Sequence, residues 1–316
     1  MTLGYSTTTD EALEGVDLAG KRILVTGASA GLGAETVRAL VSHGASVVGA
    51  VRDRAKADAA LEPARAQARR GGGVELVDLD LADLSSVRRC ADALLADGRP
   101  FDVVIANAGI MACPFGRTAD GFETQFGTNH LGHFVLINRI APLIPRGGRV
   151  VNLSSAGHRF ADVDLDDPGF ERTPYDEFVA YGRSKTANVL FAVELDRRWR
   201  ARGVRACAVH PGGILTELGR HMTPEVMGRL AQRIGTQSAD AADYPWKSIP
   251  QGAATSVWAA ATAPADAVGG RYCEDCHVAE VTDDPTSRSG VRAYALDPER
   301  ARALWAKSEE MVGERF

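Results

Sequence analysis

The sequence predicts one doubly wound α/β domain. Short, nearly continuous apolar runs alternate with helical patterns along most of the 316 residues. Such runs are typical of strands buried on both faces, and therefore of a parallel sheet covered by helices on each side. No low-complexity linker divides the chain, and a glycine-rich loop joins the first strand to the first helix. We therefore expect right-handed crossovers within one layered unit.

The elements follow in a regular order. Glycines stop the helical patterns at Gly44 and at residues 71–73. Residues 212–250 break the rhythm with three prolines, and a long insertion beyond a strand end predicts a substrate lid over about 213–248. The predicted strands are 21–26, 46–51, 74–77, 102–106, 149–153 and 204–209, and the predicted helices are 31–43, 55–70, 84–95, 121–144 and 178–202.

Composition narrows the class of protein. A net charge of −5 disfavours nucleic acid as a partner, and no apolar run reaches the roughly 18 residues needed to span a membrane. The first 20 residues are polar and acidic, unlike a signal peptide. Five scattered cysteines predict a reducing, cytoplasmic setting. We divide the chain into an N-terminal extension (1–20), the main domain (21–280) and a tail with a helix (281–316).

The glycine-rich loop at residues 26–33 predicts a phosphate site. Gly27, Gly31 and Gly33 permit a tight turn and a close approach of the backbone to a pyrophosphate. The helix that follows presents free N–H groups and the positive end of its dipole. The loop lacks the Gly-Lys-Ser/Thr of a nucleotide triphosphatase. We therefore expect a dinucleotide.

Tyr181 and Lys185 predict acid–base chemistry. Four residues apart, they share one face of the expected helix. A free tyrosine has a pKa of about 10, and a neighbouring ammonium is expected to lower it. The pair could then move a proton on or off a carbonyl oxygen.

Seven ordered motifs resemble the short-chain dehydrogenase/reductase family, in its retinol-dehydrogenase-like and WW-domain-oxidoreductase-like group. The resemblance runs from about Thr7 to Cys276. It implies a Rossmann fold with a seventh strand near 272–276 and a parallel sheet of order 3-2-1-4-5-6-7. The motifs are TGASAGLG at 26–33, LDLAD at 79–83, ANAGIM at 106–111, TADGFETQFGTNHLGHF at 118–134, VVNLSSAGH at 150–158, YGRSKTANVLF at 181–191 and HPGGILTEL at 210–218.

The resemblance also implies the roles of individual residues. Ser155 would hydrogen-bond the substrate oxygen, Tyr181 would exchange a proton with it, Lys185 would hold the ribose, and Asn129 would anchor a proton-relay water. The implied cofactor contacts are Thr26, Gly27, Ser29, Gly31, Leu32, Gly33, Arg52, Asp80, Leu81, Asn107, Ala108, Gly109, Tyr181, Lys185, Pro211, Gly212, Ile214 and Thr216.

The end of the second strand favours NADP(H), with NAD(H) still open. Val51 stands where NAD-selective enzymes carry an acid for the ribose 2′-hydroxyl. Arg52 follows, and an arginine can hold a 2′-phosphate with two hydrogen bonds. Asp53 is one position too late for the acid, and Ala30 adds no second basic residue.

The expected substrate is a medium-sized, apolar carbonyl compound or alcohol, because the segments that would surround it are apolar with a few polar groups. The leading hypothesis is an NADPH-dependent carbonyl reductase, or the reverse oxidation. The alternatives are a catalytically weak cofactor-binding regulatory protein and an epimerase or dehydratase. The expected substrate contacts are Met111, Cys113, Phe115, His158 and Phe160.

Two further expectations concern partners and metals. By family habit the chain would form a homodimer or homotetramer through the helices at 121–144 and 178–202. Cys273-x-x-Cys276-His277 matches a haem-attachment pattern, and His130 and His133 are three residues apart on a helix. We expect neither haem nor metal there, because no export signal or second ligand pair accompanies them.

Overall fold

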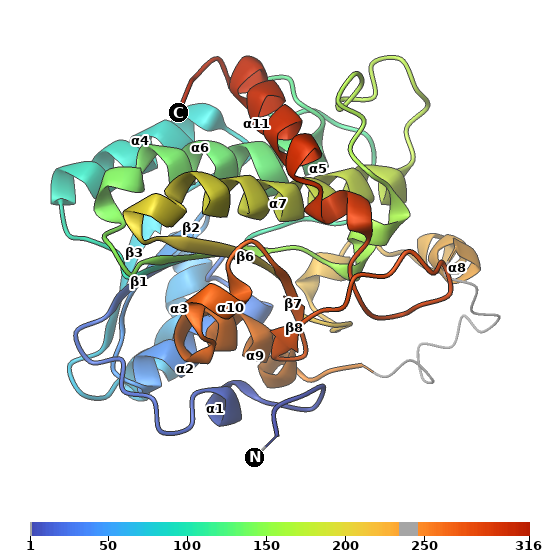
Figure 1. Ribbon diagram of the computed structural model, residues 1–316. Helices are drawn as coiled ribbons and strands as arrows, with labels where there is room; N and C mark the ends of the chain where they lie inside the picture. Colours follow the sequence, from blue (N-terminus) through green and yellow to red (C-terminus); the bar gives the residue numbers. More distant parts are fainter. Residues whose placement is uncertain (1, 234–245) are drawn as a thin grey trace.

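A single eight-stranded sheet forms the centre of the molecule (Figure 1). The computed structural model describes residues 2–233 and 246–316. The order is β3-β2-β1-β4-β5-β6-β7-β8, so the predicted order of seven parallel strands is confirmed. The eighth strand was not predicted and pairs antiparallel with β7. The strands are β1 (Arg22–Thr26), β2 (Ser46–Val51), β3 (Gly73–Asp78), β4 (Val103–Ala106), β5 (Arg149–Leu153), β6 (Arg205–His210), β7 (Tyr272–Glu274) and β8 (His277–Val278).

Helices cover both faces of the sheet (Figure 1). One layer holds α4, α6 and α7, with α11 lying over it; the other holds α2, α3, α9 and α10, with α1 at its outer side. Two apolar clusters lie between these layers and the sheet. The helices are α1 (Thr9–Ala12), α2 (Gly31–Ser42), α3 (Arg54–Ala66), α4 (Leu84–Asp97), α5 (Thr124–Phe126), α6 (Gly132–Arg139), α7 (Glu177–Trp199), α8 (Pro224–Arg233), α9 (Ile249–Val257), α10 (Ala265–Val268) and α11 (Pro298–Val312).

The continuous helix expected over 121–144 is wrong. The α-helical part begins at Thr124, because the Glu123 carboxylate accepts hydrogen bonds from the N–H groups of Gln125 and Phe126 and so caps the helix. A π-helical turn (Gly127–Leu131) then separates α5 from α6. Such turns are rare and often mark functional sites.

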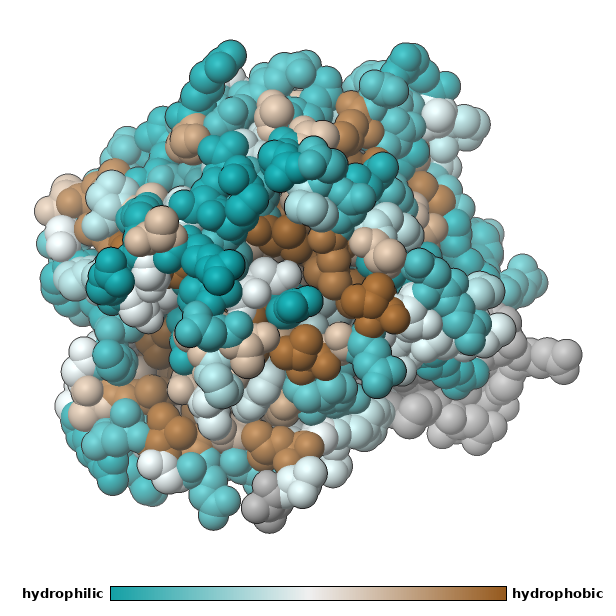
Figure 2. Space-filling model, viewed as in Figure 1, coloured by the Kyte–Doolittle hydropathy of each residue, from teal (hydrophilic) through white to brown (hydrophobic). Residues whose placement is uncertain are grey.

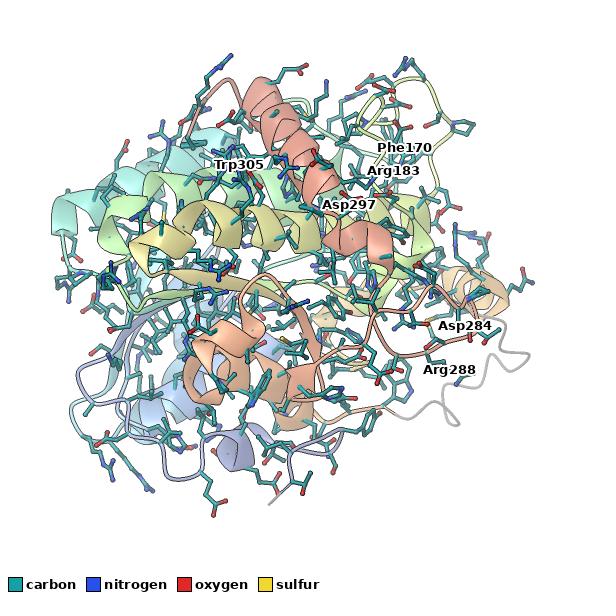
Figure 3. All side chains as sticks on the ribbon, viewed as in Figure 1. Phe170, Arg183, Asp284, Arg288, Asp297 and Trp305 are labelled. Carbon is teal, nitrogen blue, oxygen red and sulfur yellow. The ribbon has the colours of Figure 1, made fainter. Side chains whose placement is uncertain are left out.

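The helix α11 covers the face where we expected another subunit. Its Trp305 ring packs against Phe134 of α6 and Phe191 of α7, with ring centroids 5.1 and 5.8 Å away. The guanidinium of Arg198 lies 4.0 Å from the centre of the same ring. Figure 3 shows Trp305 between α11 and the helical layer beneath it. Oligomerisation through this face stays a prediction, and it would have to involve α11.

The sheet topology creates a crevice at the carboxyl ends of β1 and β4. The chain runs outward from β1 to β3 and then returns to β4 on the other side of β1. In open α/β sheets ligands bind at such a switch point. The parallel registers bring Thr26, Ala106 and Leu153, the last residues of three neighbouring strands, to the same edge.

Three further features concern the expected lid, the surface of the molecule and membrane spanning. The expected lid is described in part: α8 belongs to it, whereas residues 234–245 lie outside the described residues. Figure 2 shows a largely hydrophilic face with apolar side chains gathered near its centre. Over residues 2–233 and 246–316, no helix has the length and apolarity needed to cross a bilayer.

Candidate active site

Ser155 and Tyr181 meet at the carboxyl edge of the sheet. Ser155 follows β5, and its Oγ accepts the Gly157 N–H at 3.0 Å. A hydrogen bond joins its side chain to that of Tyr181 on α7. Gly157 makes this approach possible, because a Cβ there would lie 2.5 Å from the tyrosine ring. Burial raises the pKa of Tyr181 to about 12, and the bond to Ser155 opposes that rise.

Lys185 lies beside the tyrosine, one turn along α7. Its Nζ is 5.8 Å from the centre of the Tyr181 ring and donates to the carbonyl oxygen of Leu153 at 3.0 Å. Burial lowers the pKa of Lys185 to about 8. We expected this ammonium to lower the pKa of Tyr181. The net pKa of Tyr181 is instead raised, with desolvation of the phenolate as the largest cause, and the effect of the lysine stays a prediction.

The first turns of α7 are built to hold this pair. Asp176 caps the helix by accepting the N–H groups of Phe178 and Val179. Gly182 lets the turn after Ser155 pass close to the helix, since a Cβ there would lie 2.9 Å from the Ala161 nitrogen. Helical spacing then places residues 181 and 185 on one face.

Asn129 lies in the π-helical turn and has a fully bonded amide. Its Oδ1 accepts the Ile110 N–H at 2.9 Å, and its Nδ2 donates to the Ile110 oxygen and to Ser184 Oγ. A Cβ on Gly109 would lie 3.3 Å from Asn129 Oδ1 and 3.4 Å from Lys185 Nζ. The glycine therefore leaves the backbone after β4 close to both side chains.

The glycine loop has the shape that a dinucleotide pyrophosphate requires. A Cβ on Gly33 would lie 2.1 Å from the Gly27 oxygen, and one on Gly27 would lie 2.8 Å from the Ala108 Cα. Gly27 also has a φ of +70°, which side chains disfavour. The loop leads into α2, and Ala30, the N-cap residue before that helix, makes no side-chain cap. Its N–H groups are thus left for an anion, so these residues fit a dinucleotide cofactor.

Hydrogen bonds tie this loop to the segment after β4. Asn107 Nδ2 donates to the Thr26 oxygen at 2.8 Å, and the Ala108 N–H donates to Thr26 Oγ1 at 3.0 Å. Thr26 Oγ1 is also hydrogen-bonded to His133 Nε2. The other ring nitrogen of His133, Nδ1, is hydrogen-bonded to the backbone carbonyl oxygen of Asn129. His133 thus links the glycine loop to the π-helical turn.

Arg52 stands at the expected 2′-phosphate position with its side chain uncommitted. It follows β2, is exposed, and makes no hydrogen bond or ion pair within residues 2–233 and 246–316. One carboxylate oxygen of Asp53 accepts the Lys56 N–H and caps α3, which gives this side chain a structural role at the start of the helix. Arg54 is bonded to Asp78.

Asp80 and Leu81 follow β3. Asp80 Oδ1 accepts the Ala82 N–H at 2.9 Å, and its other carboxylate oxygen has no hydrogen bond within the described residues. Leu81 is buried against Gly132, where a Cβ would lie 2.6 Å from the Leu81 oxygen. The two residues thus lie at the carboxyl end of β3, beside the crevice.

The segment after β6 lies across the glycine loop. A Cβ on Gly31 would come 3.4 Å from Thr216 Cγ2, and Leu32 and Ile214 both pack on Gly252 of α9. Gly212 has a φ of +96° and lies against the Lys247 side chain. The expected cofactor residues after β6 therefore lie beside those after β1.

The expected substrate residues are spread between two segments. Phe115 is 47% exposed, and its ring packs edge-on against Tyr175 at 5.2 Å. Cys113 is buried, Met111 is half-buried, and Phe160 packs against Phe178.

His158 differs from the other expected substrate residues. It is fully buried, and both ring nitrogens bond to the backbone. We therefore assign it no substrate contact. His210, which also bonds the backbone of this site, was not singled out from the sequence. Its position directly before Pro211 was the available signal.

The cysteines and a hollow beside α2 and α3 give no second site. All five cysteines are free and buried, and no group of three metal-ligating side chains occurs in the described part of the chain. A hollow of about 460 Å³ opens at the carboxyl ends of α2 and α3, lined by Arg38, Arg69 and Arg70 among others. The guanidinium of Arg38 already donates hydrogen bonds to the carboxylates of Glu35 and Asp10. The helix ends present carbonyl groups, which disfavour an anion.

The chain is similar to several known proteins along most of its length. A family model described as short chain dehydrogenase matches residues 21–226. A protein of Streptomyces lividans named "Probable oxidoreductase" is 44% identical over 92% of this chain and 97% of that protein. Retinol dehydrogenase 14 of Mus musculus is 37% identical over 93% of this chain and 86% of that protein. The WW domain-containing oxidoreductase of Pongo abelii is 38% identical over 98% and 72%.

A solved structure is similar along the whole chain. An uncharacterized protein from Mycobacterium paratuberculosis aligns with a TM-score of 0.73 and 37% identity. The alignment covers 96% of this chain and 98% of that one.

Proposed function

Because the chain belongs to the short-chain dehydrogenase/reductase family, we propose that it reduces a medium-sized apolar ketone or aldehyde with NADPH. Its class is that of an oxidoreductase acting on CH–OH or C=O with a nicotinamide cofactor. The retinol-dehydrogenase-like resemblance seen in its motifs is confirmed. The observation that carries the finer proposal is the meeting of Ser155, Tyr181 and Lys185 beside the glycine loop.

The proton chemistry follows from the pKa values. A bound nicotinamide supplies or accepts the hydride. Tyr181 is protonated at neutral pH, since its pKa is about 12, and it donates that proton to the substrate oxygen. Ser155 Oγ hydrogen-bonds the same oxygen and stabilises the negative charge that develops there. Lys185, charged below pH 8, favours the tyrosinate that remains.

Asn129 supports the return of the proton. Its side chain holds the backbone of Ile110 on both its N–H and its C=O, next to Gly109 and Lys185. We propose that this fixed turn anchors the water through which Lys185 exchanges protons with solvent.

The phosphorylated cofactor is proposed from the end of β2. Within the described residues the guanidinium of Arg52 has no partner, whereas Asp53 uses one carboxylate oxygen to cap α3. A guanidinium binds phosphate with paired, charge-assisted hydrogen bonds. The glycine loop, Asp80, Asn107 and the segment after β6 are the remaining proposed contacts.

An apolar substrate is supported by two exposed side chains. Phe115 after β4 and Leu215 after β6, in the two segments expected to surround the substrate, are 47% and 65% exposed and leave apolar surface open for contact. A mouse relative is named for retinol, an apolar alcohol. We propose Met111, Cys113, Phe115 and Phe160 as substrate contacts. The same residues would serve the reverse reaction.

The test is turnover on a graded substrate panel. The purified protein should oxidise NADPH in the presence of medium-sized apolar ketones and aldehydes, and NADH more slowly. Short polar carbonyl compounds should serve poorly. NADPH binding without turnover on any carbonyl compound or alcohol would overturn the proposal in favour of a cofactor-binding regulatory protein. Turnover that leaves the substrate's redox state unchanged would favour an epimerase or dehydratase.

A further inference from the structure

Two buried histidines hold the peptide group that follows Ser155. His158 Nδ1 lies 2.7 Å from the Ser155 carbonyl oxygen. The N–H of Ala156, on the other end of the same peptide group, donates to His210 Nδ1 at 3.2 Å. One imidazole thus bonds the C=O of this peptide and the other bonds its N–H. The histidines come from different elements, His158 from the turn after Ser155 and His210 from the end of β6.

The second partner of each ring fixes its tautomer. The Arg292 N–H donates to His158 Nε2 at 3.2 Å, so the proton of that ring must be on Nδ1. The Gly212 N–H also donates to His210 Nδ1, at 3.3 Å, so the proton of that ring must be on Nε2. The two rings therefore act as opposite tautomers, one donating to the peptide and the other accepting from it.

Both rings must also stay neutral. A second proton would place an N–H against the Arg292 N–H in one case, and against the N–H groups of Ala156 and Gly212 in the other. Burial lowers the pKa of His158 to about 4 and that of His210 well below its usual range. The charged groups nearby act in the same direction: Arg159 and Arg292 face His158, and Arg159 and Lys247 face His210. The neutral ring of Tyr272 on β7 packs against both imidazoles.

The segment between β8 and α11 holds His158 and its neighbour Arg159 in place. Arg159 donates to the carbonyl oxygens of Ser287 and Arg288, and the Tyr294 hydroxyl donates to the His158 oxygen at 2.6 Å. Figure 3 labels Arg288 on the segment that runs toward α11. His158 therefore connects the Ser155 peptide to a segment more than a hundred residues away.

We propose that His158 and His210 are positioning residues that clamp the Ser155–Ala156 peptide with opposite hydrogen-bond polarity and so set the place of Ser155 Oγ. His210 also couples this peptide to Gly212, in the segment that lies beside the glycine loop. The inference rests on the proposed role of Ser155. An error of about 1 Å in such a group can cost about a hundredfold in rate.

Matched substitutions separate hydrogen bonding from packing. His210→Asn keeps an acceptor where Nδ1 stands, and His210→Leu removes it at similar size. His158→Asn keeps a donor at the same atom position, and His158→Leu removes it. We expect each leucine variant to lower kcat by about 10- to 100-fold and each asparagine variant to recover most of that loss. We also expect NADPH affinity of the His158 variants, measured by fluorescence titration, to change by less than about threefold, since the His158 ring, unlike that of His210, makes no hydrogen bond to the segment after β6.

A spectroscopic signature tests the clamp without turnover. In ¹⁵N NMR spectra of wild-type histidine side chains, His158 should carry its proton on Nδ1 and His210 on Nε2, with neither ring titrating between pH 6 and 8. Folded leucine variants with wild-type kcat, asparagine variants as impaired as the leucine ones, or two rings of the same tautomer would each overturn the inference. The predicted tautomers in a protein without any turnover would support the clamp and overturn the proposed function instead.

Discussion

The side-chain ammonium of Lys185 lies 5.8 Å from the centre of the Tyr181 ring and is held there by the carbonyl oxygen of Leu153. Burial disfavours the charged form of each group. It raises the pKa of Tyr181 to about 12 and lowers that of Lys185 to about 8. At pH 7 the tyrosine holds its proton and the lysine is charged. The pair is thus prepared to donate a proton, as reduction of a carbonyl requires.

Replacing Lys185 by methionine should raise stability while abolishing most turnover. The folded pKa lies below the unfolded value of about 10.5, so the charged lysine destabilises the fold at pH 7. Asn188 Nδ2 already donates to the Leu153 oxygen at 2.9 Å, so this oxygen should keep a partner in the variant. We expect a gain of about 3 kcal/mol in the free energy of unfolding at pH 7.

The sign of this effect can be checked with pH. The gain should be full below pH 8 and fade as pH rises from 8 to about 10.5, where the lysine is neutral in both states. Urea unfolding of both proteins across this range measures it. A variant that is less stable than wild type at pH 7 would show that the ammonium stabilises the fold.

Arg52→Ala should change cofactor preference. Loss of a charge-assisted contact to the 2′-phosphate is expected to lower kcat/KM for NADPH by about 10- to 100-fold, and that for NADH by less than about threefold. Arg54→Ala is the matched control, because that guanidinium is bonded to Asp78. Equal losses with the two cofactors would contradict the assignment of Arg52.

Gly33→Ala should damage the phosphate loop. The added methyl group would lie 2.1 Å from the Gly27 oxygen and 2.7 Å from Asn107 Nδ2, so the loop must move. We expect NADPH to bind at least about tenfold more weakly and the fold to lose about 1–3 kcal/mol. Gly73→Ala serves as the control, since no atom lies within 4 Å of its Cβ position. Unchanged NADPH affinity, measured by calorimetry, would argue against this loop as the cofactor site.

Sequence patterns predicted the parts of this protein that depend on local order. Continuous apolar runs indicated the parallel strands, and the glycines of residues 26–33 indicated a tight turn, in which Gly33 lies close to the Gly27 oxygen. Patterns could not indicate contacts set by tertiary packing. The carboxylate of Glu123 moves the start of a helix, and Trp305 brings α11 over α6.

The pKa of Tyr181 and the role of His210 show the same limit at the site. Residue spacing places Lys185 beside Tyr181, but the extent of burial decides which way the tyrosine pKa moves. His210 becomes noticeable only when the strand register brings its ring to the Ala156 peptide. Both facts depend on the folded structure.

Tyr181→Phe tests the central claim most directly. The substitution removes one hydroxyl from a buried ring, and the fold and NADPH affinity should be retained. If Tyr181 donates the proton, kcat for carbonyl reduction should fall by about 10²- to 10⁴-fold, with the dissociation constant of NADPH within about threefold of wild type. A folded Tyr181→Phe variant that binds NADPH and turns over at near the wild-type rate would contradict the account.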